Sequence, residues 1–514
     1  MISIRLFHYG LALFLLAGGG AAAEFFEPLQ PPRAFQVMVH RGAMLQAPEN
    51  TAPALERCIE EGFEWAEVDI RLTSDGKHIL FHDEQVDGKS NGTGDVKKMT
   101  LAELKALDAG SWFSARFAGE RLLTLGEGLS LCRGRLNLYL DCKDVDPILL
   151  ADEVLAAGME KQVVVFDAPE KLAQIRERSQ GRVPIMPKWH PEYGTEGWVE
   201  QWRPDAVEVN ADEVTKAICE AFHKRGIKVQ AKVLDEADQP EVWQRMRDAG
   251  VDWFQTDRAE EVIMHLSWST LPNRPVQISH HRAANYYAPE NTIVAMEKSL
   301  RLAADYVEFD VRTSSDGRFF ILHDPNLGRT TNGEGKVAET DAATLAGLEA
   351  SWDFGKPFAG LKIPTLEETF ELLGGKTGLY VDAYDITPEA LADGLKKHNL
   401  LDSAVVYQSP EYLIKLKTVN PEIRALCPLS DANQIVALHQ SVRPYGFDVS
   451  WKILSEDLIR RCHDLGIKVF SDSVDDYETA ADYQQAVKWG IDVIQTDYPV
   501  RVADALTRLS AESR

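Results

Sequence analysis

The chain has 514 residues, 45% of them hydrophobic and 26% charged, with a formal net charge of −25. This hydrophobic content is ordinary for a globular protein and excludes a disordered chain, and the length predicts two or three domains. The acidic balance argues against a nucleic-acid binder and against non-specific adhesion to anionic membranes. An anionic substrate stays possible, because a bound cation reverses the local charge.

The first residues, "MISIRLFHYGLALFLLAGGGAAAEFFEP", have the parts of a secretory signal peptide. Arg5 precedes the apolar segment "LALFLLAGG", and "AAA" before Glu24 is a small-residue cleavage site. We therefore expect residues 1–23 to be a signal peptide and the protein to be exported, either to a periplasm or out of the cell. The alternative is an uncleaved anchor, for which the apolar run is short. No other long apolar run follows, so we expect no transmembrane segment in the mature chain.

The chain contains six cysteines, at 58, 132, 142, 219, 427 and 462. An even number in an exported chain permits disulfides. However, none forms a CxxC pair and the two halves do not share cysteine positions. We expect most of them to be small buried apolar residues, and a zinc site has little support.

A long polar phrase is written twice: "HRGAMLQAPENT" at 40–51 recurs as "HRAANYYAPENT" at 281–292, an offset of 241 residues. Near the ends, "DWFQTD" at 252–257 matches "DVIQTD" at 492–497 with an offset of 240. A period of this length is a duplicated domain rather than a solenoid unit. We predict a first domain over residues 34–267 and a second over 274–510, with the boundary near "WSTLPNRP" (268–275).

In chain order, the first copy alternates short apolar runs with longer amphipathic stretches. The strand-like runs are "VMVH", "WAEVDI", "HILFH", "NLYLD", "QVVVF", "VPIM", "AVEVN", "IKVQAKV" and "DWFQT", and helical stretches include "APALERCIEEGF" and "PEKLAQIRERS". This alternation indicates parallel βα units, and a copy of this length fits an α/β fold of two tandem (β/α)8 barrels. One run too many is present, so one lies outside the barrel or the count is off. A doubly wound sheet is the alternative.

The polar residues of the repeat follow candidate strands. They are His40 and Arg41 after "VMV", Glu67 and Asp69 in "WAEVDIR", His82 after "ILF", and Asp141 and Lys143 in "NLYLDCKD". Because the carboxyl ends of parallel barrel strands form one rim, where active sites are built, these side chains are expected to converge.

Glu67 and Asp69 are two residues apart, so on a strand both point to one face. Together with Asp141 they form a trio that repels itself unless it is protonated or bridged by a cation. All-oxygen ligation suits Ca²⁺, Mg²⁺ or Mn²⁺. Solvated or salt-bridged carboxylates are the simpler interpretation, but the trio recurs at the fixed offset, which favours a metal site. The second trio is Glu308, Asp310 and Asp382.

His40 and His82 have the pKa range of a general base and a general acid. Their partners in the second copy are His281 and His323. Arg41, repeated as Arg282, offers a planar fork for phosphate oxygens, and Lys143 offers a point charge. Structural histidines and surface salt bridges are the alternatives.

The "APENT" segment is expected to be a loop before a helix. Pro48 stiffens it, and Asn50 or Thr51 is a candidate helix cap. Glu49 either touches the metal region or holds the loop. The segments "TSDG" (73–76) and "SSDG" (314–317) predict structural turns.

The ordered set "HRG", "PENT", "EVD", "TSDG", "FHD" and "DCK", with "NGTGDV" at 91–96 and "IPTLEE" at 363–368, resembles the glycerophosphodiester phosphodiesterase family over both halves. The resemblance implies (β/α)8 barrels with an insertion over residues 84 to about 120. It also implies metal-dependent hydrolysis of a small-molecule glycerophosphodiester to glycerol 3-phosphate and an alcohol. The implied roles are cation binding by the carboxylates, acid–base catalysis by the histidines, and phosphate binding by Arg41 and Lys143.

The chain departs from the family pattern at several positions. Asp141 and Asp382 stand where the family usually has Glu, and Tyr384 occupies the position of Lys143. Ala283 replaces Gly42, and Gly88 stands opposite Arg329, where the family often has Arg. We therefore expect the first copy to be the better catalyst.

Three other functions fit parts of the sequence. One is a phospholipase C- or D-like enzyme acting on lysophospholipids or phosphoinositides. Another is a binding or cell-surface protein made of degenerate barrels. A glycosidase also uses paired carboxylates, but histidines with Arg and Lys suit phosphate better than sugar. The sequence makes no prediction of the oligomeric state.

Overall fold

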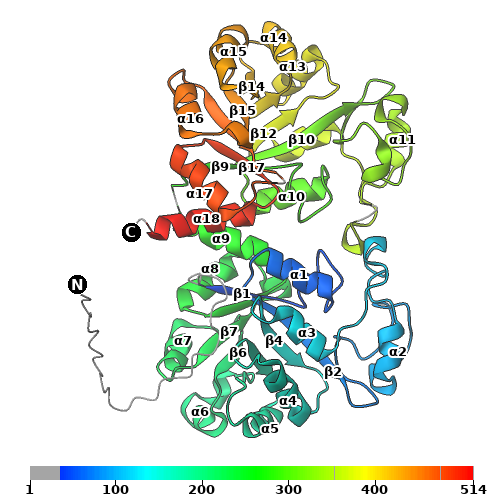
Figure 1. Ribbon diagram of the computed structural model, residues 1–514, viewed down its shortest axis with the longest axis vertical. Helices are drawn as coiled ribbons and strands as arrows, with labels where there is room; N and C mark the ends of the chain where they lie inside the picture. Colours follow the sequence, from blue (N-terminus) through cyan, green and yellow to red (C-terminus); the bar gives the residue numbers. More distant parts are fainter. Residues whose placement is uncertain (1–34, 272, 352–353, 475, 513–514) are drawn as a thin grey trace, which may run out of the picture.

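The computed structural model describes residues 35–271, 273–351, 354–474 and 476–512. It contains two consecutive α/β barrels arranged along the long axis of the molecule (Figure 1). This confirms the fold class expected from the sequence. The predicted signal peptide lies outside the described residues. None of the described helices has the length and apolar character needed to span a bilayer.

The first barrel is a ring of parallel strands wrapped by helices. Its parallel strands are β1 (Gln36–Val39), β2 (Trp65–Leu72), β4 (Asn137–Cys142), β5 (Val163–Phe166), β6 (Ala206–Asn210), β7 (Lys228–Lys232) and β8 (Trp253–Thr256). Its helices are α1 (Ala52–Glu60), α2 (Leu101–Ala106), α3 (Leu125–Cys132), α4 (Pro147–Ala157), α5 (Pro169–Ser179), α6 (Glu196–Trp202), α7 (Lys216–His223), α8 (Pro240–Ala249) and α9 (Ala259–Thr270). Residues 183–188 close the ring between β5 and β6 through isolated parallel bridges.

The second barrel repeats this order with a complete ring, in which β17 and β10 both pair with β9. Its strands are β9 (Gln277–His280), β10 (Tyr306–Thr313), β11 (Phe319–Ile321), β12 (Gly378–Asp382), β13 (Ala404–Tyr407), β14 (Arg424–Leu429), β15 (Gly446–Ser450), β16 (Lys468–Asp472) and β17 (Val493–Thr496). Its helices are α10 (Ile293–Arg301), α11 (Ala342–Gly347), α12 (Leu366–Leu373), α13 (Pro388–Lys397), α14 (Pro410–Val419), α15 (Ile435–Val442), α16 (Glu456–His463), α17 (Ala480–Trp489) and α18 (Pro499–Glu512).

The surplus apolar run of the first copy is "HILFH", which forms β3 (His78–Leu80) antiparallel to β2 and outside the ring. The "TSDG" segment makes the turn between them, with Gly76 at φ 70°. The expectation that His82 follows a parallel barrel strand is therefore wrong. His82 reaches the rim because the hairpin returns along β2, where the Phe81 amide donates to the Asp69 carbonyl at 2.9 Å.

The interior of each barrel is filled by large side chains below a polar rim. In the first barrel Trp65 packs on Trp253 with ring centroids 5.0 Å apart, and Tyr139 belongs to the same cluster. Side chains two residues apart on a strand share a face. Glu67 and Asp69 therefore continue the inward face of Trp65 towards the carboxyl end of β2.

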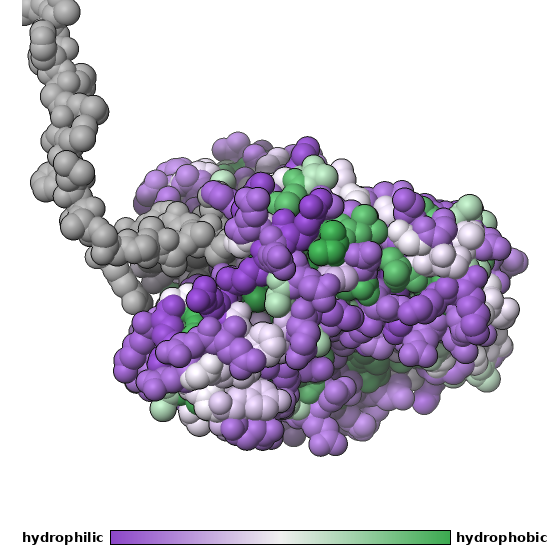
Figure 2. Space-filling view, turned by 90° about the horizontal axis from the view of Figure 1, so that it is seen from below, coloured by the Kyte–Doolittle hydropathy of each residue, from purple (hydrophilic) through white to green (hydrophobic). Residues whose placement is uncertain are grey.

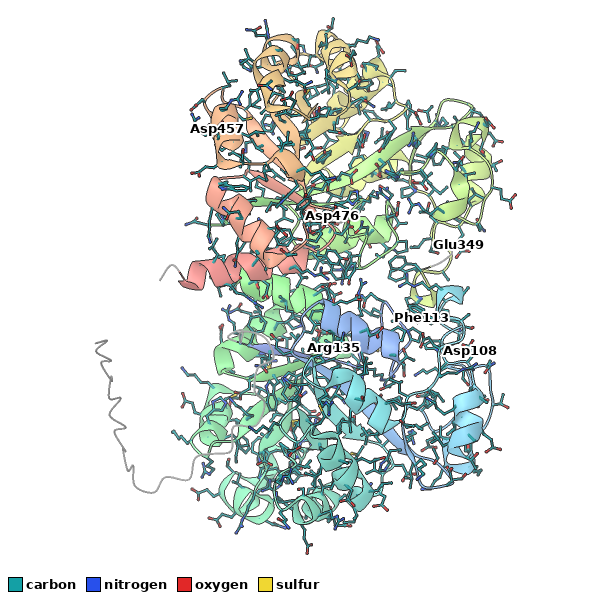
Figure 3. All side chains as sticks on the ribbon, viewed as in Figure 1. Asp108, Phe113, Arg135, Glu349, Asp457 and Asp476 are labelled. Carbon is teal, nitrogen blue, oxygen red and sulfur yellow. The ribbon has the colours of Figure 1, made fainter. Side chains whose placement is uncertain are left out.

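The predicted insertion after "HD" forms a small unit with its own apolar cluster, which includes Phe81, Val96 and Leu104. The second barrel has an equivalent unit around α11. The two insertions touch each other, because the Lys356 amide donates to the carbonyl of Phe113 at 2.8 Å (Figure 3).

The barrels also meet along α9 and α18, which lie side by side between them (Figure 1). Lys298 of the second barrel is buried between Glu260 and Glu261 of the first. The hydroxyl of Tyr287 donates to Glu61 at 2.7 Å. Removing one partner from a buried ion pair leaves an uncompensated charge in the interface, which is unfavourable. These contacts therefore determine how the two barrels pack against each other.

All six cysteines lie in the described part of the chain and are buried free thiols, as expected of small apolar residues. The face shown in Figure 2 is mostly hydrophilic with small apolar patches.

His280 on β9 generates a prediction about stability. It is fully buried, neither ring nitrogen has a hydrogen-bond partner, and burial, with Arg274 nearby, lowers its pKa to about 3. An unfolded histidine titrates near pH 6.5. The folded state therefore loses stability as pH falls from there towards 3, by about 2 kcal/mol at about pH 5.

The aligned residue of the first barrel is Val39. We expect His280→Val to remove this acid-dependent loss, measured as the unfolding free energy in urea at about pH 5 and pH 7.5. Val39→His is the mirror control and is expected to introduce the loss. An unchanged pH dependence in both variants would contradict the assignment.

Candidate active site

Three carboxylates converge at the carboxyl ends of β2 and β4. Asp69 lies opposite Asp141 in the strand register, and Glu67 lies one pleat below. One oxygen from each of the three lies within 4.8 Å of the others. Glu67 and Asp69 are completely buried. The structure thus brings together the trio singled out in the sequence.

The loop after β1 holds two of these carboxylates. The Arg41 amide donates to Glu67 Oε2 at 2.8 Å. Asn50 Nδ2 donates to Asp69 Oδ2 at 2.8 Å, and the Asp69 amide donates back to Asn50 Oδ1 at 3.0 Å. Asn50 is therefore not the helix cap. Thr51 stands at the cap position of α1, where its side chain makes no capping bond.

The trio in the first barrel is only partly neutralised. Burial, with Asp69 and Asp141 close by, raises the pKa of Glu67 well above its ordinary value. Lys143 lies 3.2 Å from Asp69 and 2.7 Å from Asp141. Burial works against ionisation of Asp69, but Lys143 and the Asn50 hydrogen bond keep its pKa below the ordinary value.

The trio fits a divalent cation. Glu67 Oε1 is buried and has no hydrogen-bond partner. Three carboxylates present only oxygen ligands, which hard cations prefer. A cation at this point would supply the positive charge that Lys143 provides in part.

The two histidines are each oriented by a carboxylate. His40 Nδ1 lies 2.8 Å from Asp257 at the end of β8, and its Nε2 lies 4.0 Å from Glu67. His82 Nδ1 lies 2.6 Å from Asp83. A carboxylate at Nδ1 selects the tautomer that leaves Nε2 for proton transfer.

The positively charged side chains of Arg41 and Lys89 form a short network of ion pairs around Glu49. Arg41 contacts Glu49 at 3.2 Å and Asp69 at 3.6 Å. Lys89 contacts Glu49 at 2.7 Å and Asp83 at 3.1 Å. Glu49 thus positions the side chains of Arg41 and Lys89 and is not part of the carboxylate trio.

The second barrel repeats the arrangement. Glu308, Asp310 and Asp382 also have oxygens within 4.8 Å of one another. His281 Nδ1 lies 2.8 Å from Asp497, and Asn291 donates to Asp310 at 2.7 Å. Arg282 lies 3.1 Å from Glu290, and His323 lies 2.7 Å from Asp324. Arg329 lies 2.7 Å from both Glu290 and Asp324.

The clearest difference is Tyr384, which stands where the first barrel has Lys143. Its hydroxyl lies 3.3 Å from His323 Nε2, and Arg312 lies 4.0 Å above its ring. Burial, with Asp310 close by, raises the pKa of Asp382 to about 8, and burial raises that of Asp310. Without the lysine, the second trio holds its protons more tightly.

The turn after β9 is also changed. Ala283 has φ 63°, a left-handed conformation that costs a residue with a Cβ more than it costs glycine. Its partner Gly42 has φ 72°, and a Cβ there would lie 3.0 Å from Ala54. The positive φ and the close approach of Ala54 both favour glycine at position 42.

Comparison with known proteins decides the family. The profile of the Glycerophosphoryl diester phosphodiesterase family matches residues 40–261 and 281–501. The chain belongs to this family. It is 31% identical over 229 residues to a glycerophosphodiester phosphodiesterase of Caldanaerobacter subterraneus subsp. tengcongensis, covering 43% of this chain and 93% of that protein.

Two further similarities have the same extent. A Bacillus subtilis glycerophosphodiester phosphodiesterase is 30% identical over 254 residues, covering 44% of this chain and 85% of the relative. The crystal structure of a glycerophosphodiester phosphodiesterase from Agrobacterium tumefaciens str. C58 has 28% identity and a TM-score of 0.42, covering 45% of this chain and 99% of that one. Each relative corresponds to about one barrel. By family, this phosphodiesterase is a phosphoric diester hydrolase.

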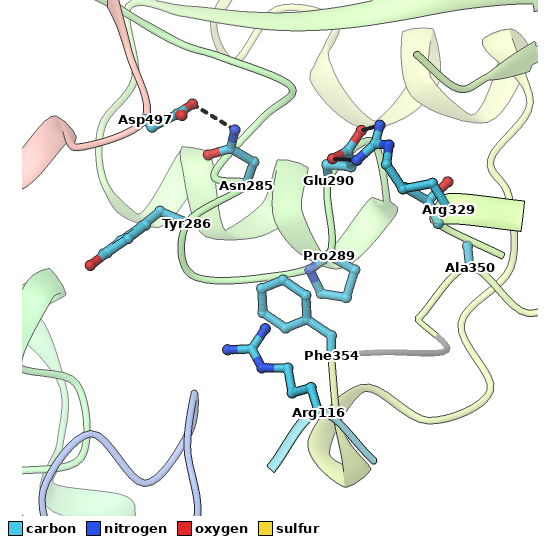
Figure 4. A pocket seen from close by; sticks show the side chains of 10 residues that line it. Arg116, Asn285, Tyr286, Pro289, Glu290, Arg329, Ala350, Phe354 and Asp497 are labelled. Atoms are coloured by element: carbon cyan, nitrogen blue, oxygen red, sulfur yellow. Dashed lines mark hydrogen bonds and ion pairs between the residues drawn. The ribbon is translucent and has the colours of Figure 1, made fainter. Parts of the chain in front are cut away.

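In this phosphodiesterase the two barrels meet at the second site. A cavity of about 210 Å³ is lined by Glu290, Arg329 and Asp497, and by Arg116 from the first barrel (Figure 4). Asn285 donates to Asp497 at 2.6 Å inside it. The opening of each barrel at the carboxyl ends of its strands is called its mouth. Part of the mouth of the second barrel is thus formed by the insertion of the first barrel.

Several residues around the sites were not predicted. Asp257 and Asp497 belong to "QTD" segments that the sequence marked only as repeat landmarks. Asn50 was considered only as a cap. Lys89 fills the gap noted at Gly88, one residue away from the position aligned with Arg329. The recurrence of "QTD" was the available signal for Asp257 and Asp497, and the recurrence of "PENT" was the signal for Asn50.

The His281–Asp497 pair generates a prediction. Burial opposes protonation of His281, but the hydrogen bond that its ring donates to Asp497, with Glu308 nearby, raises its pKa to about 9. We expect Asp497→Asn to lower that pKa by at least about one unit, measured by NMR titration of the histidine ring in chelator-treated protein. Asp324→Asn, which faces His323, is the control and is expected to leave His281 unchanged. The same His281 titration in Asp497→Asn would contradict this role.

Proposed function

We propose that each barrel hydrolyses glycerophosphodiesters to glycerol 3-phosphate and an alcohol, using a divalent cation and a pair of histidines. The observation that carries the proposal is the convergence of two oriented histidines, three carboxylates and an arginine at one barrel rim. This set occurs twice in a chain of the phosphodiesterase family.

Glu67, Asp69 and Asp141 would hold the cation in the first barrel, and Glu308, Asp310 and Asp382 in the second. When bound, such a cation neutralises the diester and stabilises the charge that develops on phosphorus-bound oxygens. The ligand set suits Ca²⁺, Mg²⁺ or Mn²⁺.

The protein groups have separate tasks in this mechanism. Arg41 and Lys143 bind phosphate oxygens by charge-assisted hydrogen bonds. One histidine takes the proton of the glycerol hydroxyl next to the phosphoester, and that oxygen attacks phosphorus. The other histidine gives its proton to the departing alcohol. Water then opens the cyclic phosphate with the proton transfers reversed, which yields glycerol 3-phosphate. Internal attack is fast because the nucleophile is already tethered.

We also propose that the enzyme works after export, in a periplasm or outside the cell. The support is the positive, apolar and small-residue pattern of residues 1–23. Amino-terminal sequencing of the protein recovered from its native compartment tests this, and an intact Met1 would contradict cleavage.

The first test is release of glycerol 3-phosphate from several glycerophosphodiesters with a panel of divalent cations. We expect exhaustive chelation, or His40→Ala combined with His281→Ala, to reduce release by at least about a hundredfold. Bis(p-nitrophenyl) phosphate lacks the neighbouring hydroxyl and is expected to react poorly. Full activity without metal would contradict the cation role.

Other outcomes separate the competing functions. Turnover of lysophospholipids without turnover of glycerophosphodiesters would favour a phospholipase-like enzyme. Saturable metal binding with no turnover of any diester would favour a binding protein.

A second test exchanges the residues that distinguish the barrels. With the other barrel silenced through its histidines, Lys143→Tyr is expected to lower kcat/KM by about one to two decades, because a charge-assisted phosphate contact is lost. Tyr384→Lys is expected to raise it in the second barrel. Lys143→Arg keeps the charge and serves as control. Equal activity of the two unmodified barrels would contradict the expected ranking.

A further inference from the structure

The half of each mouth away from the carboxylate trio differs between the barrels. In the second barrel, the carboxyl ends of β13 to β16 surround a cavity of about 420 Å³. Its lining includes Tyr407, Asp448, Trp451, Asp472 and Tyr477. None of these residues has a role in the proposed proton transfers.

The charges on this side are changed between copies. Strand register aligns Lys188 of the first barrel with Pro428 of the second, since each faces the acidic residue Glu208 or Asp448. In the first barrel Lys188 lies 2.7 Å from Glu208. Lys232, the last residue of β7, aligns with Asp472, the last residue of β16.

One change has the opposite sign, because Lys452 replaces Asp212. Lys452 lines the cavity and is exposed to solvent. Over these positions, with Lys452 and Tyr384 included, the second barrel is still two charges more negative than the first. The second mouth has therefore lost the counterparts of Lys188 and Lys232 and kept an acidic residue, Asp448, at the position of Glu208.

Aromatic rings appear at the same place. Trp451 replaces Ala211, and Tyr477 replaces Ala237. The rings of Trp451 and Tyr477 are 6.0 Å apart and nearly parallel, at 23°. Tyr407, which replaces Phe166, adds a third ring to the lining.

The cavity adjoins the carboxylate site through Tyr407. Tyr407 ends the strand next to Asp382 and lies opposite it in the register. Both Asp448, on the cavity side, and Asp382, on the catalytic side, act electrostatically on Tyr407. A diester held at the trio can therefore extend one of its two substituents into the cavity.

We propose that this cavity binds a positively charged alcohol group of the quaternary or primary ammonium class, so that the second barrel selects glycerophosphodiesters with a cationic head group. Aromatic faces and carboxylates together recognise ammonium ions by cation–π and ionic attraction. The first barrel, with Lys188 paired to Glu208 and Lys232 at the place of Asp472, is expected to attract such a group less. This inference rests on the proposed function for its substrate backbone.

The test uses the full chain with His40→Ala and His82→Ala, so that only the second barrel turns over. We compare kcat/KM for glycerophosphocholine with that for glycerophosphoglycerol, whose head group is neutral. Glycerophosphocholine is expected to be preferred. Asp472→Lys and Trp451→Ala, each introducing the first-barrel residue, are expected to lower its kcat/KM by at least about tenfold through KM, with a much smaller effect on the neutral substrate.

The neutral substrate also controls for folding of the variants. The mirror variant is Lys232→Asp in a chain with His281→Ala and His323→Ala, and it is expected to improve glycerophosphocholine relative to glycerophosphoglycerol. The absence of a choline preference in the second barrel would overturn the proposal. Equal losses for both substrates would also overturn it, since the cavity would then hold the glycerol part.

A titration with choline chloride separates this inference from the proposed function. If neither barrel hydrolyses any diester, the proposed function fails. Saturable quenching of tryptophan fluorescence by choline, lost in Trp451→Ala and weakened in Asp472→Lys, would still support the ammonium subsite. No saturable binding of choline would overturn it.

Discussion

Mutual repulsion among three buried carboxylates is the constraint around which each barrel mouth is organised. The barrel register forces it, because Asp69 and Asp141 lie opposite each other on neighbouring strands and Glu67 shares their face. Like charges at this separation, away from water, cannot all ionise unaided. The surrounding residues reduce this repulsion by donating hydrogen bonds to the trio. The donors are the Arg41 amide, the Asn50 side chain and the Lys143 ammonium.

The two barrels meet this constraint differently. In the first, Lys143 supplies a permanent positive charge, so that Asp69 stays ionised more readily than an ordinary aspartate. In the second, Tyr384 brings only a hydroxyl, and burial raises the pKa of Asp310, the counterpart of Asp69. A cation entering either trio displaces protons, and one entering the first also competes with a lysine. Metal affinity of the two sites should therefore depend differently on pH.

The sequence was sufficient for the fold class and for the convergence of the histidines and carboxylates. These residues adjoin hydrophobic strands, and the repeat offset identifies them twice. Strand direction was not predictable, since an apolar run such as "HILFH" looks the same whether it lies in the ring or returns beside it. The residues that pair with the histidines and with Glu49 were also not predicted. Asp257 approaches His40 from the last strand of the barrel, and Lys89 replaces an expected arginine from the adjacent position.

The middle residues of the repeated segment, 42–46 and 283–287, explain why the two copies are not interchangeable. Both copies keep "HR" and "APENT", which touch the carboxylates, but the second has Asn285, Tyr286 and Tyr287 between them. Asn285 donates to the carboxylate that holds His281. Tyr286 lies against Arg57 of the first barrel, and Tyr287 donates to Glu61. One loop therefore orients a candidate catalytic histidine at one point and docks the neighbouring barrel at the next. Any shift between the barrels would be transmitted over a few residues to His281, so the packing of the tandem is part of the second site.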